Sequence, residues 1–160
     1  MIFEQLKKWN IVVIFMCLFA GMALYGVAEA AGDVQTNQTI QAENYYFQWG
    51  TGLNGAGTGV SYREYRSDTK YNLTVTSTDY TTFRARVASG GANGGGTYLV
   101  TVDGHSVARF SIPNTGGWVR FQTVSVPVSI PDHLDGGTYV LRIYKETNSS
   151  SGVIDWVQFR

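Results

Sequence analysis

Hydrophobic and polar residues alternate in short runs from Thr39 to the end of the chain, and clusters of Gly, Asn, Asp and Ser separate these runs. Residues 71–76 and 80–88 show the pattern most clearly, because every second side chain is apolar. The apolar positions of these two runs are Tyr71, Leu73, Val75, Phe83, Ala85 and Val87. A period of two residues is that of a β-strand, and no stretch shows a helical period over ten residues. The pattern therefore predicts an all-β domain.

Turn signals divide this domain into strands. Asp103-Gly104 is typical of a type I′ hairpin, in which both central residues need positive φ. Residues 118–128 are long enough to need a bulge or bend, and residues 48–58 read as a Gly-rich loop. Strands at this spacing predict a jelly-roll β-sandwich of two antiparallel sheets. The further strands are expected at residues 39–44, 60–62, 97–102, 106–112, 138–146 and 153–159.

The first 30 residues differ in kind from the rest. Lys7 and Lys8 precede an apolar run over residues 11–27, and Ala28-Glu29-Ala30 offers small residues for cleavage. This arrangement predicts a secretory signal peptide with cleavage near Ala30, and an uncleaved anchor is the alternative. We expect residues 31–38 to form a short linker and residues 39–160 to form the module, located outside the cytoplasm.

The only cysteine of the sequence lies in this leader, so the remaining chain forms no disulfide. Small exported domains are often stabilised by disulfides or by a metal ion, which makes a structural metal site worth seeking.

The charge of the chain limits its partners. Twelve basic residues balance twelve acidic ones, and only 15% of the residues are charged. A nucleic-acid-binding protein needs a basic surplus to replace the counterions of the phosphates. We therefore expect no nucleic-acid partner, and no membrane contact once the leader is removed.

The sequence offers little for catalysis. His105 and His133 both follow turn residues, where a lone histidine is usually solvated, and no nucleophile elbow or phosphate loop is present. Glycoside hydrolysis needs two carboxyl groups. Glu64 with Asp68 or Asp79 is the nearest such pair, and ion pairing with neighbouring basic residues explains it more simply.

Oxygen-bearing side chains suggest a site for a hard cation. The strand period places Gln41 and Glu43 on one face of the first strand, with Ile40 and Ala42 toward the core. Asp155 lies in the last strand, and first and last strands often lie side by side in sandwiches. Amide, carboxylate and backbone oxygens suit Ca²⁺. An ordinary polar strand face is the competing explanation.

Aromatic residues in turn contexts point to sugar binding. Trp118 follows Asn114-Thr115-Gly116-Gly117 and is presented at a loop tip, and Tyr62 and Tyr65 lie in another polar region. Exposed rings stack on the C–H faces of sugars while nearby polar groups bind hydroxyls. Most other aromatic residues belong to the core, and we predict this for Phe83, Phe110, Phe121 and Trp156.

Four motifs, in order, resemble those of the family 6 carbohydrate-binding modules. Residues 40–45 are similar to the family's I-x-A-E-D/N-Y, and residues 83–89 to its F-R-V-A-S strand. Residues 115–118 match T-G-G-W, and residues 154–159 resemble I/L-D-W-F-x-F. Family 35 is the nearest competitor.

This resemblance implies a jelly roll with structural Ca²⁺ held by Gln41, Glu43 and Asp155. It also implies a sugar site in the loops at one end, with Tyr62 and Trp118 on either side of a glycosyl ring.

The chain also departs from the family pattern. The family reads G-Y-x-D-x-G-D-W-V-x-Y around the binding tyrosine, and residues 61–71 keep only the two tyrosines. An asparagine that commonly contacts the sugar is Val153 here, and Asn148 is the expected substitute. The basic residues near Tyr62 suggest an anionic or sulfated sugar. These residues are Arg63, Arg66 and Lys70.

Together these observations predict a secreted, non-catalytic module that binds a polysaccharide or oligosaccharide. We expect a monomer, with a glycoside hydrolase as its partner. The alternatives are a small glycan-cleaving enzyme on the same fold and a surface adhesion protein.

Overall fold

The computed structural model describes residues 34–57 and 59–160. The predicted signal peptide, with its cleavage site, lies outside these residues. Within the described ranges, no helix has the length and apolar character needed to cross a membrane.

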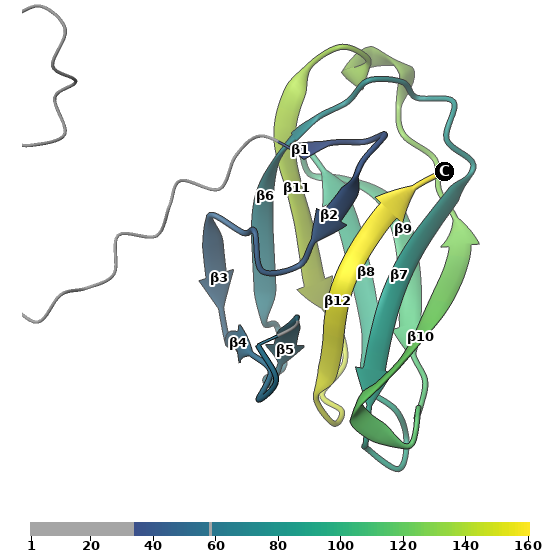
Figure 1. The fold of residues 1–160 in the computed structure, drawn as a ribbon. Helices are drawn as coiled ribbons and strands as arrows, with labels where there is room; N and C mark the ends of the chain where they lie inside the picture. The colour runs from purple at the N-terminus through teal and green to yellow at the C-terminus, as the bar shows by residue number, and fades with distance from the viewer. Residues whose placement is uncertain (1–33, 58) are drawn as a thin grey trace, which may run out of the picture.

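The chain folds as two β-sheets packed face to face (Figure 1). In the first sheet the strands run in the order β1-β6-β11-β8-β9, and β3 pairs with β6 beside β1. These strands are β1 (Val34–Gln35), β3 (Phe47–Trp49), β6 (Asp68–Thr74), β8 (Gly96–Val102), β9 (His105–Ile112) and β11 (Thr138–Lys145).

The second sheet has the order β10-β7-β12-β5-β4, and β2 pairs with β12. Its strands are β2 (Thr39–Gln41), β4 (Thr51–Leu53), β5 (Val60–Tyr62), β7 (Thr82–Ser89), β10 (Gly117–Pro127) and β12 (Gly152–Phe159). All pairings are antiparallel except that of β1 with β6. The predicted β-sandwich of two antiparallel sheets is confirmed.

The strand alternation predicted from the sequence sets the core. The inward positions of β6 and β7 are buried, while Arg84 and Arg86 on β7 lie on the outer face. Phe83 and Phe110 are core residues, as expected. Phe121 and Trp156 are only partly buried, which corrects the prediction that they belong to the core. Phe121 instead lies outside, with the Arg86 guanidinium 4.6 Å from its ring centre.

Tyrosine hydroxyls connect the two sheets through the core. The Tyr62 hydroxyl on β5 lies 2.5 Å from Thr69 Oγ1 on β6, and the Tyr71 hydroxyl on β6 donates to the Ala42 carbonyl at 2.7 Å. A buried phenol needs a hydrogen-bond partner, because leaving its polar group unpaired is costly. Each of these tyrosines satisfies that need across the sandwich.

Two predicted irregularities are confirmed. Asp103 and Gly104 both have positive φ, at 50° and 81°, as a type I′ hairpin requires. The pairing of β10 with β7 shifts register between Gly117 and Gln122. The sandwich also uses residues that the sequence assigned to connections. β1 lies in the expected linker, β4 lies in the expected Gly-rich loop, and β3 spans the start of that loop. Strands this short need only two or three residues to pair.

Candidate functional site

β10 begins at the lower end of the sandwich in Figure 1, and Trp118 is the second residue of this strand. The loop before it is fixed by Thr115, whose N–H donates to the Ser89 carbonyl at 2.9 Å. Asn114 Oδ1 accepts a hydrogen bond from the Gly116 N–H at 2.8 Å. A Cβ at Gly90 would come within 2.9 Å of the Trp118 indole, so glycine leaves room for the ring there. The indole is therefore held by a defined loop, and the Trp118 residue remains 45% exposed.

A pocket of about 620 Å³ opens beside this tryptophan. We call it the Trp118 pocket. Three segments that are distant in sequence form it: the turn between β4 and β5 together with β5 and the residue after it, the start of β10, and the residue before β12. Its wall combines an aromatic surface with amide, hydroxyl and guanidinium groups. The lining residues are Asn54, Gly55, Ala56, Ser61, Arg63, Trp118, Val119 and Ser151.

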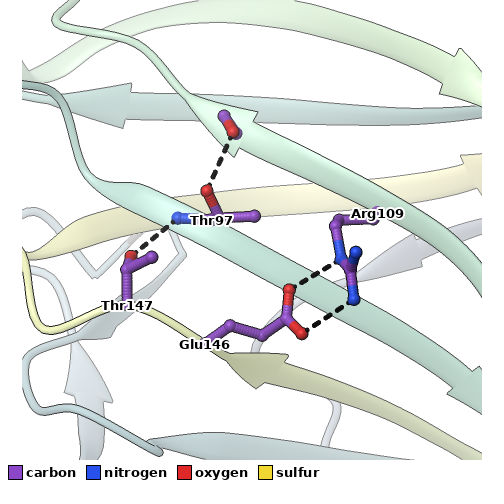
Figure 2. Close-up of polar contacts among 5 residues, drawn as sticks. Thr97, Arg109, Glu146 and Thr147 are labelled. Carbon is purple, nitrogen blue, oxygen red and sulfur yellow. Dashed lines mark hydrogen bonds and ion pairs between the residues drawn. The ribbon is translucent and has the colours of Figure 1, made fainter.

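The loop between β11 and β12, which carries Ser151, is held at its base (Figure 2). Thr147 Oγ1 accepts a hydrogen bond from the Thr97 N–H at 2.9 Å, and Thr97 Oγ1 lies 3.0 Å from Ser111 Oγ. Arg109 forms a two-pronged ion pair with Glu146, with Nε 2.8 Å from one carboxylate oxygen and Nη2 3.1 Å from the other. The loop thus leaves the first sheet in a fixed direction.

Lys145 holds the same loop from inside. Its side chain is fully buried, and its ammonium donates to the Ser149 and Ser150 carbonyls at 2.9 Å each. A third carbonyl, that of Tyr62, lies 3.5 Å away. Burial lowers the pKa of Lys145 from its ordinary value, because the charged form loses hydration. This side chain therefore links the β11–β12 loop to the end of β5.

Tyr62 does not form part of the pocket, and its predicted stacking role is wrong. Its side chain is fully buried and meets the Tyr98 ring edge-on, with the ring centres 5.2 Å apart. Burial raises the pKa of Tyr62 well above its usual range. The reason is the strand period. On β5 the residues flanking Ser61 point inward, so Ser61 faces the pocket instead.

Of the other residues predicted to contact the sugar, only one lines the Trp118 pocket. Arg63 lines the Trp118 pocket. Tyr65 is 45% exposed and lies under the Arg66 guanidinium, 5.3 Å from its ring centre, but it is not among the lining residues. Asn148 is exposed in the β11–β12 loop, and Ser151 of that loop, rather than Asn148, lines the pocket.

The predicted basic cluster is split between two faces. Arg66 and Lys70 line a second depression of about 540 Å³ on the first sheet, which we call the aromatic-cationic groove. Lys70 lies 4.4 Å from the Phe47 ring centre, and Trp49 is 51% exposed. Phe47 and Trp49 are two residues apart, so both lie on one face of β3. This aromatic pair was missed in the sequence, because no strand was predicted here. The lining residues are Phe47, Trp49, Arg66, Asp68, Lys70, Arg142 and Tyr144.

The carboxylates considered for catalysis do not meet in the Trp118 pocket. The Asp68 carboxylate is buried and lies 2.6 Å from Arg142 Nε, in the floor of the other groove. Glu64 is exposed, and Asp79 accepts a hydrogen bond from Ser77. The described residues that line the Trp118 pocket include no carboxylate.

Two of the three residues expected to hold a cation, Gln41 and Asp155, lie on paired strands, and Glu43 lies in the turn directly after β2. β2 and β12 are paired, and the Ala42 N–H donates to the Asp155 carbonyl at 2.9 Å. Glu43 Oε2 is buried and makes no hydrogen bond to any residue that the structure describes. An unpaired buried carboxylate oxygen fits a bound cation, since burial of an unpaired charge is costly.

Two features limit which side chains could coordinate a cation at this edge. Asp155 already forms an ion pair with Arg86, and Gln41 is exposed. Across residues 34–57 and 59–160, no group of three or more His, Cys, Asp or Glu side chains is arranged to hold a metal. A cation here would therefore also need amide or backbone oxygens, which Ca²⁺ accepts.

Comparison with solved structures shows close agreement in fold. A family 6 carbohydrate-binding module from Clostridium cellulolyticum, in complex with xylose, superposes with a TM-score of 0.67 at 24% identity, covering 79% of this chain and 98% of that one. A β-1,3-glucan-binding family 6 module from Bacillus halodurans gives 0.65 at 26% identity, covering 81% and 99%. A family 35 module from Clostridium thermocellum gives 0.61 at 21% identity, covering 75% and 94%.

A search of curated proteins found no match. The family model for carbohydrate-binding module family 6 matches residues 41–160, which is most of the chain and nearly all of the described sandwich. Residues 34–40, which lie before this match, supply β1 and the start of β2 to the same sandwich. On the strength of that match and the shared fold, the chain belongs to the family 6 carbohydrate-binding modules.

Proposed function

We propose that this chain is a non-catalytic module that binds a glycan in the Trp118 pocket. The exposed indole of Trp118 carries the proposal, because it supplies an apolar surface at the mouth of a pocket. An apolar wall with a few placed polar groups is the usual form of a small-molecule site. A sugar ring matches it, with C–H groups on one face and hydroxyls around its edge.

The polar groups of the pocket suit hydroxyl recognition. Asn54 and Ser61 of the β4–β5 hairpin and Ser151 before β12 bring amide and hydroxyl groups, and Arg63 brings donors of fixed geometry. The solved relatives include modules described as complexed with xylose or as binding β-1,3-glucan, which supports a neutral sugar ring as the basic ligand. Of the three cations expected beside the sugar, only Arg63 remains, so preference for an anionic glycan depends on this residue.

Trp118→Ala and Trp49→Ala form a matched pair of variants for the test. Both tryptophans are about equally exposed, at 45% and 51%, but they lie in different depressions. Affinity gels of xylan and β-glucan, beside alginate, pectin and carrageenan, would measure retardation of the full chain. We expect Trp118→Ala to lose retardation and Trp49→Ala to keep it, because loss of a stacking ring removes about 1–3 kcal/mol.

The reverse result would contradict the proposal and would place the ligand in the aromatic-cationic groove. Arg63→Gln tests charge preference separately. If it lowers retardation by charged polymers alone, Arg63 selects anionic sugars. Equal loss on neutral xylan would show that Arg63 binds hydroxyls instead.

We also propose that Ca²⁺ stabilises the edge where β2 meets β12. The buried, unpaired Glu43 Oε2 supports this, and Gln41 and Asp155 lie on the two adjoining strands. A bound cation would neutralise the Glu43 carboxylate and join the two strands. Since ligands that bind only the folded state stabilise it, Ca²⁺ at 100 times its Kd would add about 2.7 kcal/mol.

Thermal unfolding with EDTA and with added Ca²⁺ measures this effect. We expect EDTA to lower the Tm of the full chain, and Glu43→Gln to abolish most of that difference. Asp79→Asn is the matched control, because it removes an exposed carboxylate far from this edge in sequence. A Tm that is the same in EDTA and in Ca²⁺ would contradict the calcium site.

A further inference from the structure

The two histidines of the chain, which are 28 positions apart in sequence, meet at one place on the surface. The His105 and His133 ring centres lie 5.0 Å apart, with the ring planes inclined at 74°. Both residues are exposed. His105 begins β9, whereas β10 begins next to the far end of that strand, so this pair lies at the opposite end of the sandwich from Trp118.

The backbone beneath both rings is well anchored. His105 follows the Asp103-Gly104 hairpin, and the Asp103 N–H donates to the Val140 carbonyl at 3.0 Å. His133 lies in the short 3₁₀-helix η2 (Asp132–Leu134), whose Leu134 is only 1% exposed. The Ser129 N–H donates to the Val107 carbonyl at 3.1 Å, which joins the segment before η2 to β9. The separation of the two histidines is therefore set by the fold.

This separation matches that of two imidazoles bound to one metal ion. A ligating nitrogen lies about 2.0–2.1 Å from Zn²⁺, which puts the ring centre about 3.2 Å from the metal. With ligand angles between about 90° and 109°, two such ring centres are about 4.5–5.2 Å apart. The observed 5.0 Å lies in that range. Because χ2 of histidine is broad and both rings are exposed, each can turn a nitrogen toward a shared ion.

The local charge also favours a cation. The two segments that carry the histidines, residues 103–107 and 128–137, contain Asp103, Asp132 and Asp135 but neither Lys nor Arg. All three carboxylates are exposed, so they contribute a negative potential around the imidazoles without being neutralised by a base in either segment.

We propose that His105 and His133 form a surface site for a divalent transition-metal ion such as Zn²⁺, Ni²⁺ or Cu²⁺. Imidazole suits these ions, whereas Ca²⁺ and Mg²⁺ prefer oxygen ligands. Water completes the coordination, so the site is open and exchangeable. The ion joins the β8–β9 hairpin to the crossover that leads from β10 in one sheet to β11 in the other.

The test is calorimetric titration of the full chain, made without a polyhistidine tag, with Zn²⁺ and Ni²⁺. We expect His105→Asn and His133→Asn each to weaken the binding of one equivalent. Outer-shell changes already cost 10–100-fold at metal sites, so loss of a direct ligand should cost about tenfold or more. Asp79→Asn is the control that leaves binding unchanged, and excess Ca²⁺ should not compete.

Thermal unfolding gives a second readout that remains useful if titration is complicated by other weak sites. Zn²⁺ should raise the Tm of the unaltered chain and not that of the double variant His105→Asn/His133→Asn, since only the folded chain brings the rings together. Both side chains are exposed, so the variants should fold as the parent does without metal. Equal Zn²⁺ affinity and equal Tm response in parent and double variant would overturn the proposal.

Discussion

At the residue scale, the direction of one side chain separates a core role from a binding role. Trp118 and Tyr62 were expected to face each other across a sugar, yet only Trp118 is exposed. Tyr62 instead uses its hydroxyl to reach Thr69 on the opposite sheet. Its contribution should therefore appear in stability and not in ligand binding.

Tyr62→Phe tests this role. The change removes the hydroxyl and leaves the buried Thr69 side chain without this partner, so we expect the free energy of unfolding to fall by about 1–2 kcal/mol. Retardation in glycan gels should stay the same. Guanidinium unfolding midpoints measure the loss, and Tyr65→Phe is the exposed control, with a change of less than about 0.5 kcal/mol. Weaker glycan binding with unchanged stability would contradict the core role.

The sequence contained the information that decides between these two aromatic residues. Trp118 follows a glycine pair in a loop, where burial of a large ring is difficult. Tyr62 lies in a predicted three-residue strand, and the strand period assigns it to the same face as Val60. The strand period therefore predicts that the Tyr62 side chain faces the core, whereas the resemblance to the family motif implied that it contacts a sugar. The family motif suggested what Tyr62 does, whereas the alternation of the strand determined which way its side chain points.

At the element scale, the β11–β12 loop depends on a single buried cation. The Lys145 ammonium donates to the carbonyls of Ser149 and Ser150, and Ser151 next to them lines the Trp118 pocket. The ion pair at the base of the loop, between Arg109 and Glu146, is exposed on its arginine side. Exposed pairs contribute little, so the buried contact should dominate the order of the loop.

Lys145→Met removes the ammonium while keeping an unbranched side chain of similar reach. Two carbonyls then lose their donor, at a cost of about 1 kcal/mol or more each if they stay dry, so the loop should open to water. We expect faster amide exchange over residues 146–151 and glycan affinity about fivefold lower. Hydrogen exchange and affinity gels measure the two effects.

Arg109→Ala is the matched control, because it loosens the same loop only at its exposed base. Faster exchange in Arg109→Ala than in Lys145→Met would contradict the dominance of the buried contact. Global stability of Lys145→Met should change little, since removal of a buried charge offsets the lost hydrogen bonds.

The elements themselves were largely predictable, and the site only in part. The longer strands follow from alternation, and the type I′ hairpin follows from its Asp-Gly pair. The short strands β3 and β4 were missed, since three residues give almost no period to detect. Because β3 was not predicted, the groove formed by Phe47 and Trp49 was not recognised. Arg66 and Lys70, which line this groove, were therefore predicted to lie beside the sugar. Which face a basic side chain occupies depends on strand pairing, which composition does not encode.

At the scale of the whole molecule, the core between the two sheets contains three buried phenols that must stay protonated. Burial raises the pKa of Tyr62, Tyr71 and Tyr98 far above the ordinary value of 10. All three rings lie between the sheets, and each hydroxyl has a partner in the fold. The folded chain therefore holds these three protons at a pH where the unfolded chain releases them.

These buried phenols make the free energy of unfolding depend on pH above about 10. Below pH 10 both states keep the three protons, and the stabilisation is complete. As the pH rises above 10, the unfolded chain loses them first, so the free energy of unfolding falls by up to about 4 kcal/mol per pH unit. Lys145, with its lowered pKa, acts in the opposite direction below 10.5, but it is one group against three.

Absorbance at 295 nm during an alkaline titration would reveal this coupling. Of the ten tyrosines in the chain, Tyr62, Tyr71 and Tyr98 should ionise only in a steep step that coincides with the loss of far-ultraviolet β signal, because all three are buried in the folded chain. Tyr98→Phe should remove one ionisation from the step and reduce its steepness by a third. Ionisation of Tyr62, Tyr71 and Tyr98 with the sandwich still folded would show that burial does not hold these three protons.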